Sequence, residues 1–462
     1  MATLHLAGPK GPALQLPSVS LSTCVGRVLS DVGRVLLDPV LLDPAWIVTV
    51  GAVALSACQA APKPAEQAPA AAVGFAAVAN QKGGQDQTGP YDVVADWPKP
   101  LSQLAGHEKW TWGAVQGIFA ESPNRVFILQ RGELPKLERP EEIPYPKVGP
   151  SISFPVSQTP FRNASVGPIS SPGNAGSDGW NGWKGTLGID ARWEHCVLVV
   201  NADGTITEDW TKWDSLFRRP HFVGINPYDP DKHVWIVDDR QHAVYKFTND
   251  GKTLVQTLGV KGVPGTDSTH FNRPTFLAWL PDSTMYVSDG YANTRVVKFD
   301  KDGKYLMTWG EKGTPPNDTR PGTFDAVHGV QVDPATRMVY VTDRSSHRIE
   351  AFDENGKYID QFSTGVPSTP QVLFLAADKN FWIADNTTSK IVKYDLGGHY
   401  QYSWGSQGEW PGAMWNVHGM SVDQDGNLYL AEVNNGRPQK FRPRRGANPA
   451  FLVGQPVRSP SS

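Results

Sequence analysis

Short runs in which apolar and polar residues alternate recur along the chain from about residue 110 onward. Runs that end in an acidic residue stand at 234–238, 285–289, 339–343, 381–385 and 428–432. A second alternating run follows each of them, and most copies continue with an Asp-Gly, Asn-Gly or Gly-Gly turn and a third run. A period of two residues broken by tight turns is typical of antiparallel strands joined as a meander. We therefore predict an all-β domain.

The repeat interval of about 45 to 55 residues fits a four-stranded propeller blade far better than a pair of helices. A sustained apolar period of 3.6 residues is not found in any segment. Six units can be counted, at roughly 110–215, 216–266, 267–320, 321–366, 367–410 and 411–455. The sequence therefore predicts a six-bladed β-propeller.

The first blade is the least regular of the six. Residues 125–131 are expected to form its inner strand, and residues 196–200 belong to its outer pair. Between them lies a segment, 134–181, that is rich in Pro, Ser and Gly. An insertion of this length without strands is uncommon, and it usually serves as a functional loop such as a lid or is disordered.

The composition also divides the chain into segments. We expect a leader at 1–58, an Ala/Pro/Gln-rich linker at 59–96, the propeller at 97–455 and a tail at 456–462. The linker contains too few large apolar residues to offset the chain entropy lost on folding.

The leader carries an apolar run at 46–57, which is too short to span a bilayer because a spanning helix needs about 20 residues. The run ends in Leu-Ser-Ala-Cys58, which resembles the signal of bacterial lipoproteins. We expect membrane contact only through a lipid anchor at Cys58, and a location in the bacterial cell envelope, periplasmic or at the surface, or secretion. The basic residue nearest upstream is Arg34, so a disordered apolar leader or a misplaced start codon stays open.

Composition and charge narrow the range of partners. The 462 residues include 45 Gly, 39 Pro and 16 Trp with only 19% charged residues, as expected for short strands and many turns. A formal net charge of -3 gives no reason to expect nucleic acid as a partner, so we expect a small-molecule or peptide-derived substrate and a monomer. The three cysteines, Cys24, Cys58 and Cys196, are too few for a disulfide framework.

One position of the repeat carries the candidate chemistry. Aligned on the inner strand of each blade, it reads Gln116, His221, Thr275, His328, Gln371 and His418. This position lies beside the central channel of a propeller, where ligands usually bind. Histidine falls on every second blade, so three imidazoles should approach the axis from directions about 120° apart in a ring of six.

Three imidazoles with a fourth position left open are typical of a catalytic zinc site. We therefore predict that His221, His328 and His418 bind Zn²⁺, although imidazole also suits other divalent transition metals. The alternative is that these histidines recur only because the blades resemble one another.

Beyond the histidines, three segments stand out: VSDGYANTRVVKF at 287–299, FILQRGE at 127–133, and Asp343-Arg344 with Arg348-Ile349. Together with the histidines they resemble the peptidyl-α-hydroxyglycine α-amidating lyases and their bacterial NHL-repeat relatives, over about residues 110–451. The segment VSDGYANTRVVKF resembles the one that supplies the active-site tyrosine of the family, here Tyr291. The segment FILQRGE resembles the one with the catalytic arginine, here Arg131. A further segment resembles the one whose arginine lies near the substrate carboxylate, here Arg344.

The resemblance implies a lyase that cleaves the C–N bond of an N-(α-hydroxyalkyl) amide, a carbinolamide, to an amide and an aldehyde. Zinc would stabilise the negative charge that grows on the substrate oxygen. Tyr291 would take the hydroxyl proton, with Arg131 as the cation that favours its phenolate. Arg344 would hold a carboxylate of the substrate through two hydrogen bonds.

The sequence departs from the family at three positions, Gly419, Asn416 and Ala292. The acidic calcium ligand of the family is replaced by Gly419, which argues against structural Ca²⁺, and the family's loop cysteine is replaced by Ala292. Two other functions therefore stay open: a zinc hydrolase of an ester, lactone or amide on the same site, and a binding platform without enzymatic activity.

Overall fold

The computed structural model describes residues 85–135, 142–144, 153–155, 192–314 and 318–458. The predicted leader with Cys58, most of the linker and nearly all of the 134–181 insertion lie outside the described residues. Within the described ranges, no helix is both long and apolar enough to cross a membrane.

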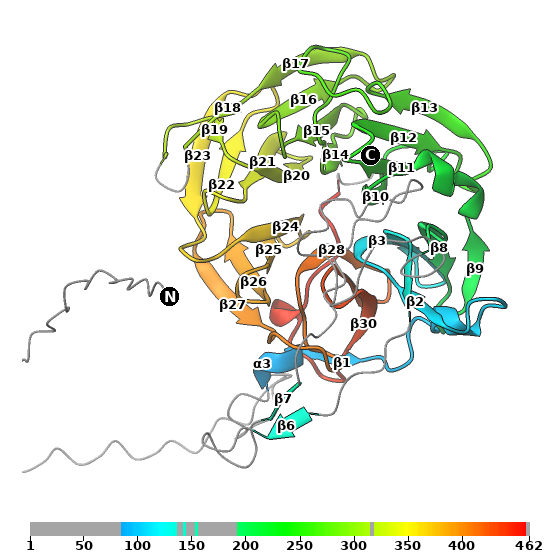
Figure 1. Ribbon diagram of the computed structural model, residues 1–462. Coiled ribbons are helices and arrows are strands. Elements are labelled where there is room, and N and C mark those ends of the chain that lie inside the picture. The colour runs from blue at the N-terminus through cyan, green and yellow to red at the C-terminus, as the bar shows by residue number, and fades with distance from the viewer. Residues whose placement is uncertain (1–84, 136–141, 145–152, 156–191, 315–317, 459–462) are drawn as a thin grey trace, which may run out of the picture. The chain divides into compact units, whose positions relative to one another are not determined.

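Six four-stranded antiparallel sheets stand around a ring, as predicted (Figure 1). From the innermost strand outward they are β3 (Val115–Ser122), β4 (Arg125–Gln130), β8 (Val197–Val200) and β9 (Ile206–Asp209); β10 (Pro220–Ile225), β11 (Val234–Asp238), β12 (Ala243–Phe247) and β13 (Leu254–Leu258); β14 (Leu277–Trp279), β15 (Met285–Asp289), β16 (Arg295–Phe299) and β17 (Tyr305–Trp309); β20 (Val327–Asp333), β21 (Met338–Asp343), β22 (Arg348–Phe352) and β23 (Tyr358–Ser363); β24 (Pro370–Leu375), β25 (Asn380–Asp385), β26 (Lys390–Asp395) and β27 (Tyr400–Trp404); and β28 (Val417–Val422), β29 (Leu428–Glu432), β30 (Arg437–Pro443) and β1 (Tyr91–Val93).

Short elements connect or flank the blades. They are α3 (Gln85–Thr88), η2 (Leu101–Gln103), η4 (Thr211–Leu216), η5 (Pro449–Phe451), the paired strands β2 (Trp110–Trp112) and β5 (Glu133–Pro135), the paired strands β6 (Glu142–Pro144) and β7 (Ser153–Pro155), and the paired strands β18 (Glu311–Lys312) and β19 (Thr323–Phe324).

The sixth blade takes its outermost strand from the N-terminal side of the propeller. β1 pairs with β30, with Tyr91 opposite Pro443 and Val93 opposite Phe441. These residues were expected in the 59–96 linker, so the ordered domain begins earlier than predicted. A strand of only three residues has no alternation long enough to be recognised. In the first blade, similarly, 125–130 is the second strand, because β3 lies inside it.

Adjacent blades are joined by an aromatic residue that covers the outer hairpin of the next blade. An added Cβ at Gly251, in the hairpin of the second blade, would lie 2.2 Å from Trp210 of the first. A Cβ at Gly356, in the fourth blade, would lie 2.6 Å from Trp309 of the third. Both glycines also have positive φ, so a glycine is required for the turn and for the contact.

In five of the six blades, the acidic residue that ends the second strand binds the chain segment leading into the innermost strand of the same blade. Its carboxylate accepts hydrogen bonds from backbone N–H groups of that segment. The pairs are Asp238 with Arg218 and Arg219, Asp289 with Asn272, Asp343 with Asp325 and Ala326, Asp385 with Thr369, and Glu432 with Trp415, at 2.6 to 3.2 Å. The recurring carboxylate is therefore a structural part of the repeat.

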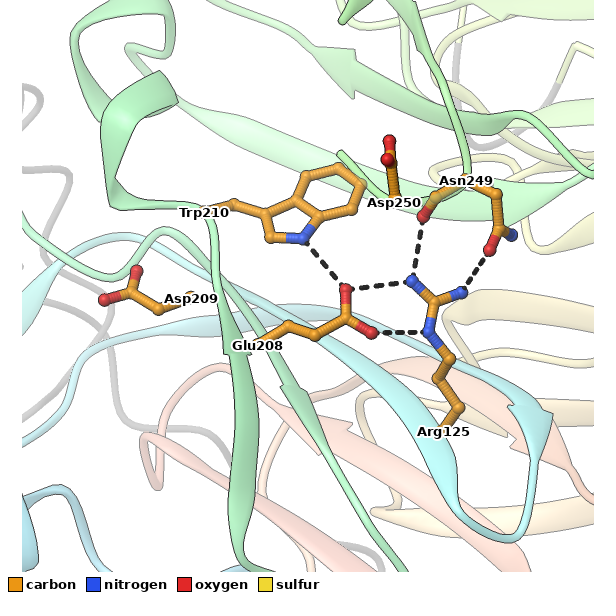
Figure 2. Close-up of a pocket in the computed structure, with 6 residues that line it drawn as sticks. All are labelled: Arg125, Glu208, Asp209, Trp210, Asn249 and Asp250. Atoms are coloured by element: carbon orange, nitrogen blue, oxygen red, sulfur yellow. Dashed lines mark hydrogen bonds and ion pairs between the residues drawn. The ribbon is translucent and has the colours of Figure 1, made fainter. Parts of the chain in front are cut away.

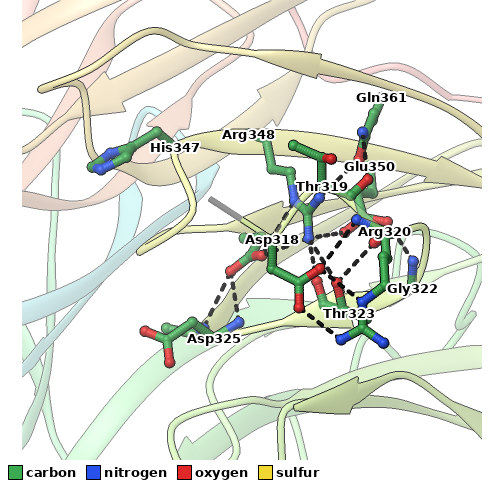
Figure 3. A network of polar contacts seen from close by, with 12 residues as sticks. Asp318, Thr319, Arg320, Gly322, Thr323, Asp325, His347, Arg348, Glu350 and Gln361 are labelled. Atoms are coloured by element: carbon green, nitrogen blue, oxygen red, sulfur yellow. Dashed lines mark hydrogen bonds and ion pairs between the residues drawn. The ribbon is translucent and has the colours of Figure 1, made fainter. Parts of the chain in front are cut away.

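The fourth blade extends this pattern into an ion-pair network. The buried guanidinium of Arg348 lies 3.2 Å from Asp343 and 3.0 Å from Glu350 and also donates to the Thr323 carbonyl oxygen. Figure 3 shows Arg348 within this network, whereas the neighbouring His347 points away from it. The network fixes the turn before β22, on which His347 faces the cavity described below.

Closure of the ring should depend on the side chain of Tyr91. It is fully buried, its ring packs at 5.5 Å from Trp404, and its hydroxyl accepts a hydrogen bond of 2.7 Å from the Val453 N–H. We expect Tyr91→Ala to lower the free energy of unfolding by about 3–5 kcal/mol, the usual cost of truncating a buried aromatic residue. Chemical denaturation measures this.

The neighbouring Asp92 offers the matched control for this variant. Its carboxylate is half exposed and pairs with Arg444 at 3.1 Å. Asp92→Ala should cost no more than about 1 kcal/mol. If Tyr91→Ala lowered the free energy of unfolding as little as Asp92→Ala does, the Tyr91 side chain would not be needed to close the ring. The backbone hydrogen bonds of β1 would then be sufficient.

Candidate metal centre

The six aligned residues of the repeat share one local geometry. In five blades the pairing register between the first two strands shifts at this residue, which marks a β-bulge. A bulge turns its residue out of the regular alternation of the strand. All six side chains are buried: Gln116, His221, Thr275, His328, Gln371 and His418. The aligned position is therefore a buried position that recurs in every blade, and in five blades it is a β-bulge.

Each of the three histidines is oriented by the blade that follows it. His221 Nδ1 lies 3.0 Å from the Thr275 carbonyl oxygen, His328 Nδ1 2.6 Å from that of Gln371, and His418 Nδ1 2.9 Å from that of Gln116. A carbonyl oxygen can only accept a hydrogen bond, so each Nδ1 carries the proton. The intervening residues Thr275, Gln371 and Gln116 thus supply the carbonyl groups that leave every Nε2 with a free lone pair.

The three imidazole rings lie close together. The ring centroids are 4.4 to 5.2 Å apart, and one ligand atom from each of His221, His328 and His418 lies within 4.8 Å of the others. Burial, with the nearby positive charges, holds the pKa of His221 and His328 well below the ordinary value. Burial likewise lowers the pKa of His418 to about 3. All three are neutral at physiological pH, the state in which imidazole binds a metal.

Tyr291 reaches the same point from the loop after β15. Its hydroxyl lies 3.0 Å from His221 Nε2 and 3.0 Å from His328 Nε2. Gly290 brings this loop against the fourth blade, since an added Cβ there would lie 1.5 Å from the Val327 carbonyl oxygen. The structure therefore brings the tyrosine and the histidines together at one place.

These residues fit a divalent metal ion. A phenol has one proton to donate, whereas the lone pairs of His221 Nε2 and His328 Nε2 both face it, and His418 is close by. A hydroxyl alone leaves at least one buried acceptor without a proton, but a cation among the three nitrogens satisfies all of them. An all-imidazole set suits zinc and several other transition metals.

A second set of side chains surrounds the histidines. The residue that follows the second strand of each blade donates its backbone N–H to the carbonyl group before the innermost strand. These residues are Arg131, Asp239, Tyr291 (one residue later, after Gly290), Arg344, Asn386 and Val433. The three predicted catalytic residues thus occupy equivalent places in the first, third and fourth blades, at one mouth of the channel.

The mouth of the channel is a cavity of about 620 Å³ with a positive lining. The described residues that line it include Arg131, Arg219, Arg273 and Arg344 but no carboxylate. Behind them the buried Asp239 pairs with Arg273 at 2.9 Å and with Arg219 at 3.4 Å. Guanidinium groups are the side chains that bind carboxylates and phosphates through paired hydrogen bonds, so this lining suits an anionic ligand.

Two arginines contact Tyr291 directly. Arg344 Nη1 lies 3.4 Å from the Tyr291 hydroxyl, and the guanidinium carbon of Arg344 is 5.1 Å from the ring centroid. The guanidinium carbon of Arg273 lies 4.7 Å from the same ring. Arg131 is buried and donates a hydrogen bond of 2.7 Å to Gln116 Oε1. Sequence reasoning missed Arg219, Arg273 and Asp239. Arg219 and Arg273 each stand two residues before the aligned position of their blade, and Asp239 follows the second strand of its blade.

Comparison with known proteins finds similarity to peptide-amidating enzymes. The chain is 29% identical over 272 residues to peptidyl-alpha-hydroxyglycine alpha-amidating lyase 1 of Drosophila melanogaster, covering 54% of this chain and 49% of that protein. It is 28% identical over 285 residues to peptidylglycine alpha-amidating monooxygenase of Rattus norvegicus, covering 59% of this chain and 24% of that protein. The chain therefore matches less than half the length of either relative.

The remaining comparisons add no functional information. No protein-family model matches the chain. A solved streptogramin B lyase aligns with 74% of this chain and 96% of its own, with 14% identity and a TM-score of 0.40.

Proposed function

From the premise that this chain is a six-bladed propeller similar in sequence to amidating lyases, we propose that it cleaves the C–N bond of an N-(α-hydroxyalkyl) amide. The products are an amide and an aldehyde. The observation that carries the proposal is the position of the Tyr291 hydroxyl, 3.0 Å from the Nε2 atoms of both His221 and His328. A phenol in this place can exchange a proton with a substrate hydroxyl bound beside the histidines.

His221, His328 and His418 would hold the metal ion, which we propose to be zinc. When bound, the ion supplies Lewis acidity that stabilises negative charge on the substrate oxygen.

Tyr291 acts as the base in this proposal. An ordinary phenol is a poor base at neutral pH, so a neighbouring positive charge is needed to favour the phenolate. Arg344 and Arg273 provide that charge, because both guanidinium groups lie against the phenol ring. This extends the expectation drawn from sequence, in which Arg131 alone had the task.

The reaction needs no water. Tyr291 removes the hydroxyl proton of the substrate, the electron pair of the O–H bond forms the C=O bond, and the C–N bond breaks. The nitrogen leaves with the C–N electron pair and takes a proton, which Tyr291 returns. The guanidinium groups of the cavity, Arg131 among them, bind an anionic group of the substrate and orient the carbinolamide.

Turnover of N-benzoyl-α-hydroxyglycine in H₂¹⁸O tests this reaction. We expect benzamide without ¹⁸O, together with glyoxylate, at a rate well above that of the reaction without enzyme. Hydrolysis of the amide bond would instead give benzoate that carries ¹⁸O, because the oxygen of water attacks the acyl carbon. Labelled benzoate, or no acceleration by the metal-loaded protein, would refute the lyase proposal.

A further inference from the structure

A second cluster of metal-ligating side chains lies in the first blade, apart from the histidines of the channel. One ligand atom from each of His107, Glu194 and His195 lies within 4.8 Å of the others. We propose that these three residues form a second site for a divalent transition metal such as zinc. Two imidazoles with one carboxylate are a ligand set that binds zinc in proteins.

A buried carboxylate between the imidazoles orients both of them. Glu133 is fully buried, and its two oxygens lie 2.8 Å from His107 Nδ1 and 2.5 Å from His195 Nδ1. The ring centroids of the two histidines are 4.6 Å apart. A carboxylate on Nδ1 fixes the ring and directs the lone pair of Nε2 to the metal, which is the arrangement around many zinc ligands.

Carboxylates stand on the Nε2 side of both rings. His107 Nε2 lies 3.7 Å from Glu194 Oε2, and His195 Nε2 lies 3.4 Å from Asp209 Oδ2. Figure 2 shows the Asp209 carboxylate turned away from the Arg125–Glu208 ion pair, because neighbouring residues of β9 face opposite sides of the sheet. The Asp209 carboxylate therefore adds negative charge beside His195.

Exposure and charge also suit a cation. The histidine side chains are only 10% and 7% exposed, whereas those of Glu194 and Asp209 are 38% and 49% exposed, so an ion can reach the site from solvent. Glu133, Glu194 and Asp209 carry three negative charges, and Arg192, which pairs with Glu194 at 3.0 Å, carries one positive charge. With neutral imidazoles the sum is -2, which one divalent ion balances.

The site would join chain segments that are far apart in sequence. Glu133 and Arg192 form reciprocal backbone hydrogen bonds of 2.7 and 2.9 Å on either side of residues 136–191. His107 comes from the segment before β2, and His195 from the segment before β8. An ion bound by His107, Glu194 and His195 would link the two chain segments that flank residues 136–191. Glu133, which contacts both histidines, stands two residues after Arg131 in the sequence.

Counting the metal ions bound by the full-length chain tests the proposal. Each protein is stripped with a chelator, reloaded with Zn²⁺, freed of excess metal by gel filtration and measured by mass spectrometry of the metal. We expect His107→Ala/His195→Ala to bind one ion fewer per chain than the wild type. This difference does not depend on whether the channel histidines are occupied.

His399→Ala is the matched control, because His399 pairs with Asp395 on an exposed turn. It should bind as many ions as the wild type. If the double variant also bound that number, the cluster would be an ion-pair network without metal.

Glu194→Gln keeps the test decisive if the double variant fails to fold. The Glu194 side chain is partly exposed, so loss of its charge leaves the packing intact. We expect the affinity for one Zn²⁺ ion to fall at least ten-fold in a competition titration with a chromophoric chelator. Unchanged affinity for every bound ion would overturn the proposal.

Discussion

His328→Ala is expected to release one metal ion per chain and to lower kcat/KM for a carbinolamide about a thousand-fold or more. The ring of His328 is fully buried, and its Nε2 is one of three that converge at the channel axis. Loss of a bound Lewis acid removes several kcal/mol of charge stabilisation, and about 4 kcal/mol corresponds to a factor of a thousand in rate. Metal content and initial rates are measured on the same preparation.

Gln371→Ala is the control at the equivalent position of the next blade. Gln371 orients His328 through its backbone carbonyl group, which alanine keeps. This variant should therefore retain the full metal content. A His328→Ala protein that is folded and still holds as much metal as Gln371→Ala would contradict the three-histidine site.

Tyr291→Phe is expected to lower kcat by about a hundred- to ten-thousand-fold, the usual contribution of a positioned base. Phenylalanine keeps the ring against Arg273 and Arg344 and removes only the oxygen that lies between His221 and His328. Metal content should stay unchanged, because the three imidazoles remain. The measurement is single-turnover kinetics on metal-loaded protein.

Three measurements on Tyr291→Phe, namely kcat, metal content and melting temperature, distinguish a chemical role of Tyr291 from a structural one. A purely structural role of Tyr291 would show as a lower melting temperature or lost metal, with kcat per bound metal preserved. An unchanged kcat in Tyr291→Phe would remove the tyrosine from the mechanism and leave only the metal site.

The blades could be predicted from sequence because each repeat combines a two-residue period with tight turns. The three histidines could be predicted for a related reason. The repeat aligns them, and their place on every second blade is the arrangement that a shared ligand would require. Tyr291 and Arg344 needed the family resemblance as well, because a polar residue after the second strand is ordinary in every blade.

The rest of the site could not be predicted because it depends on side-chain contacts between segments that are far apart in sequence. Arg273 precedes an innermost strand, with positive φ, and only the folded ring brings it to Tyr291. Glu133 meets His195 across 62 residues of sequence, most of them in the insertion. The strand β1 was missed because its pairing with β30 joins the two ends of the propeller.

The hydrogen bond from His418 to the Gln116 carbonyl group spans 302 residues of sequence, from the last blade to the first. On a ribosome, the first five blades are therefore synthesised before the third imidazole exists, and even then its orientation depends on a residue made at the start. No shortened product that lacks the last blade can hold an ion in this way. A three-histidine site would therefore be complete only after the last blade has packed against the first.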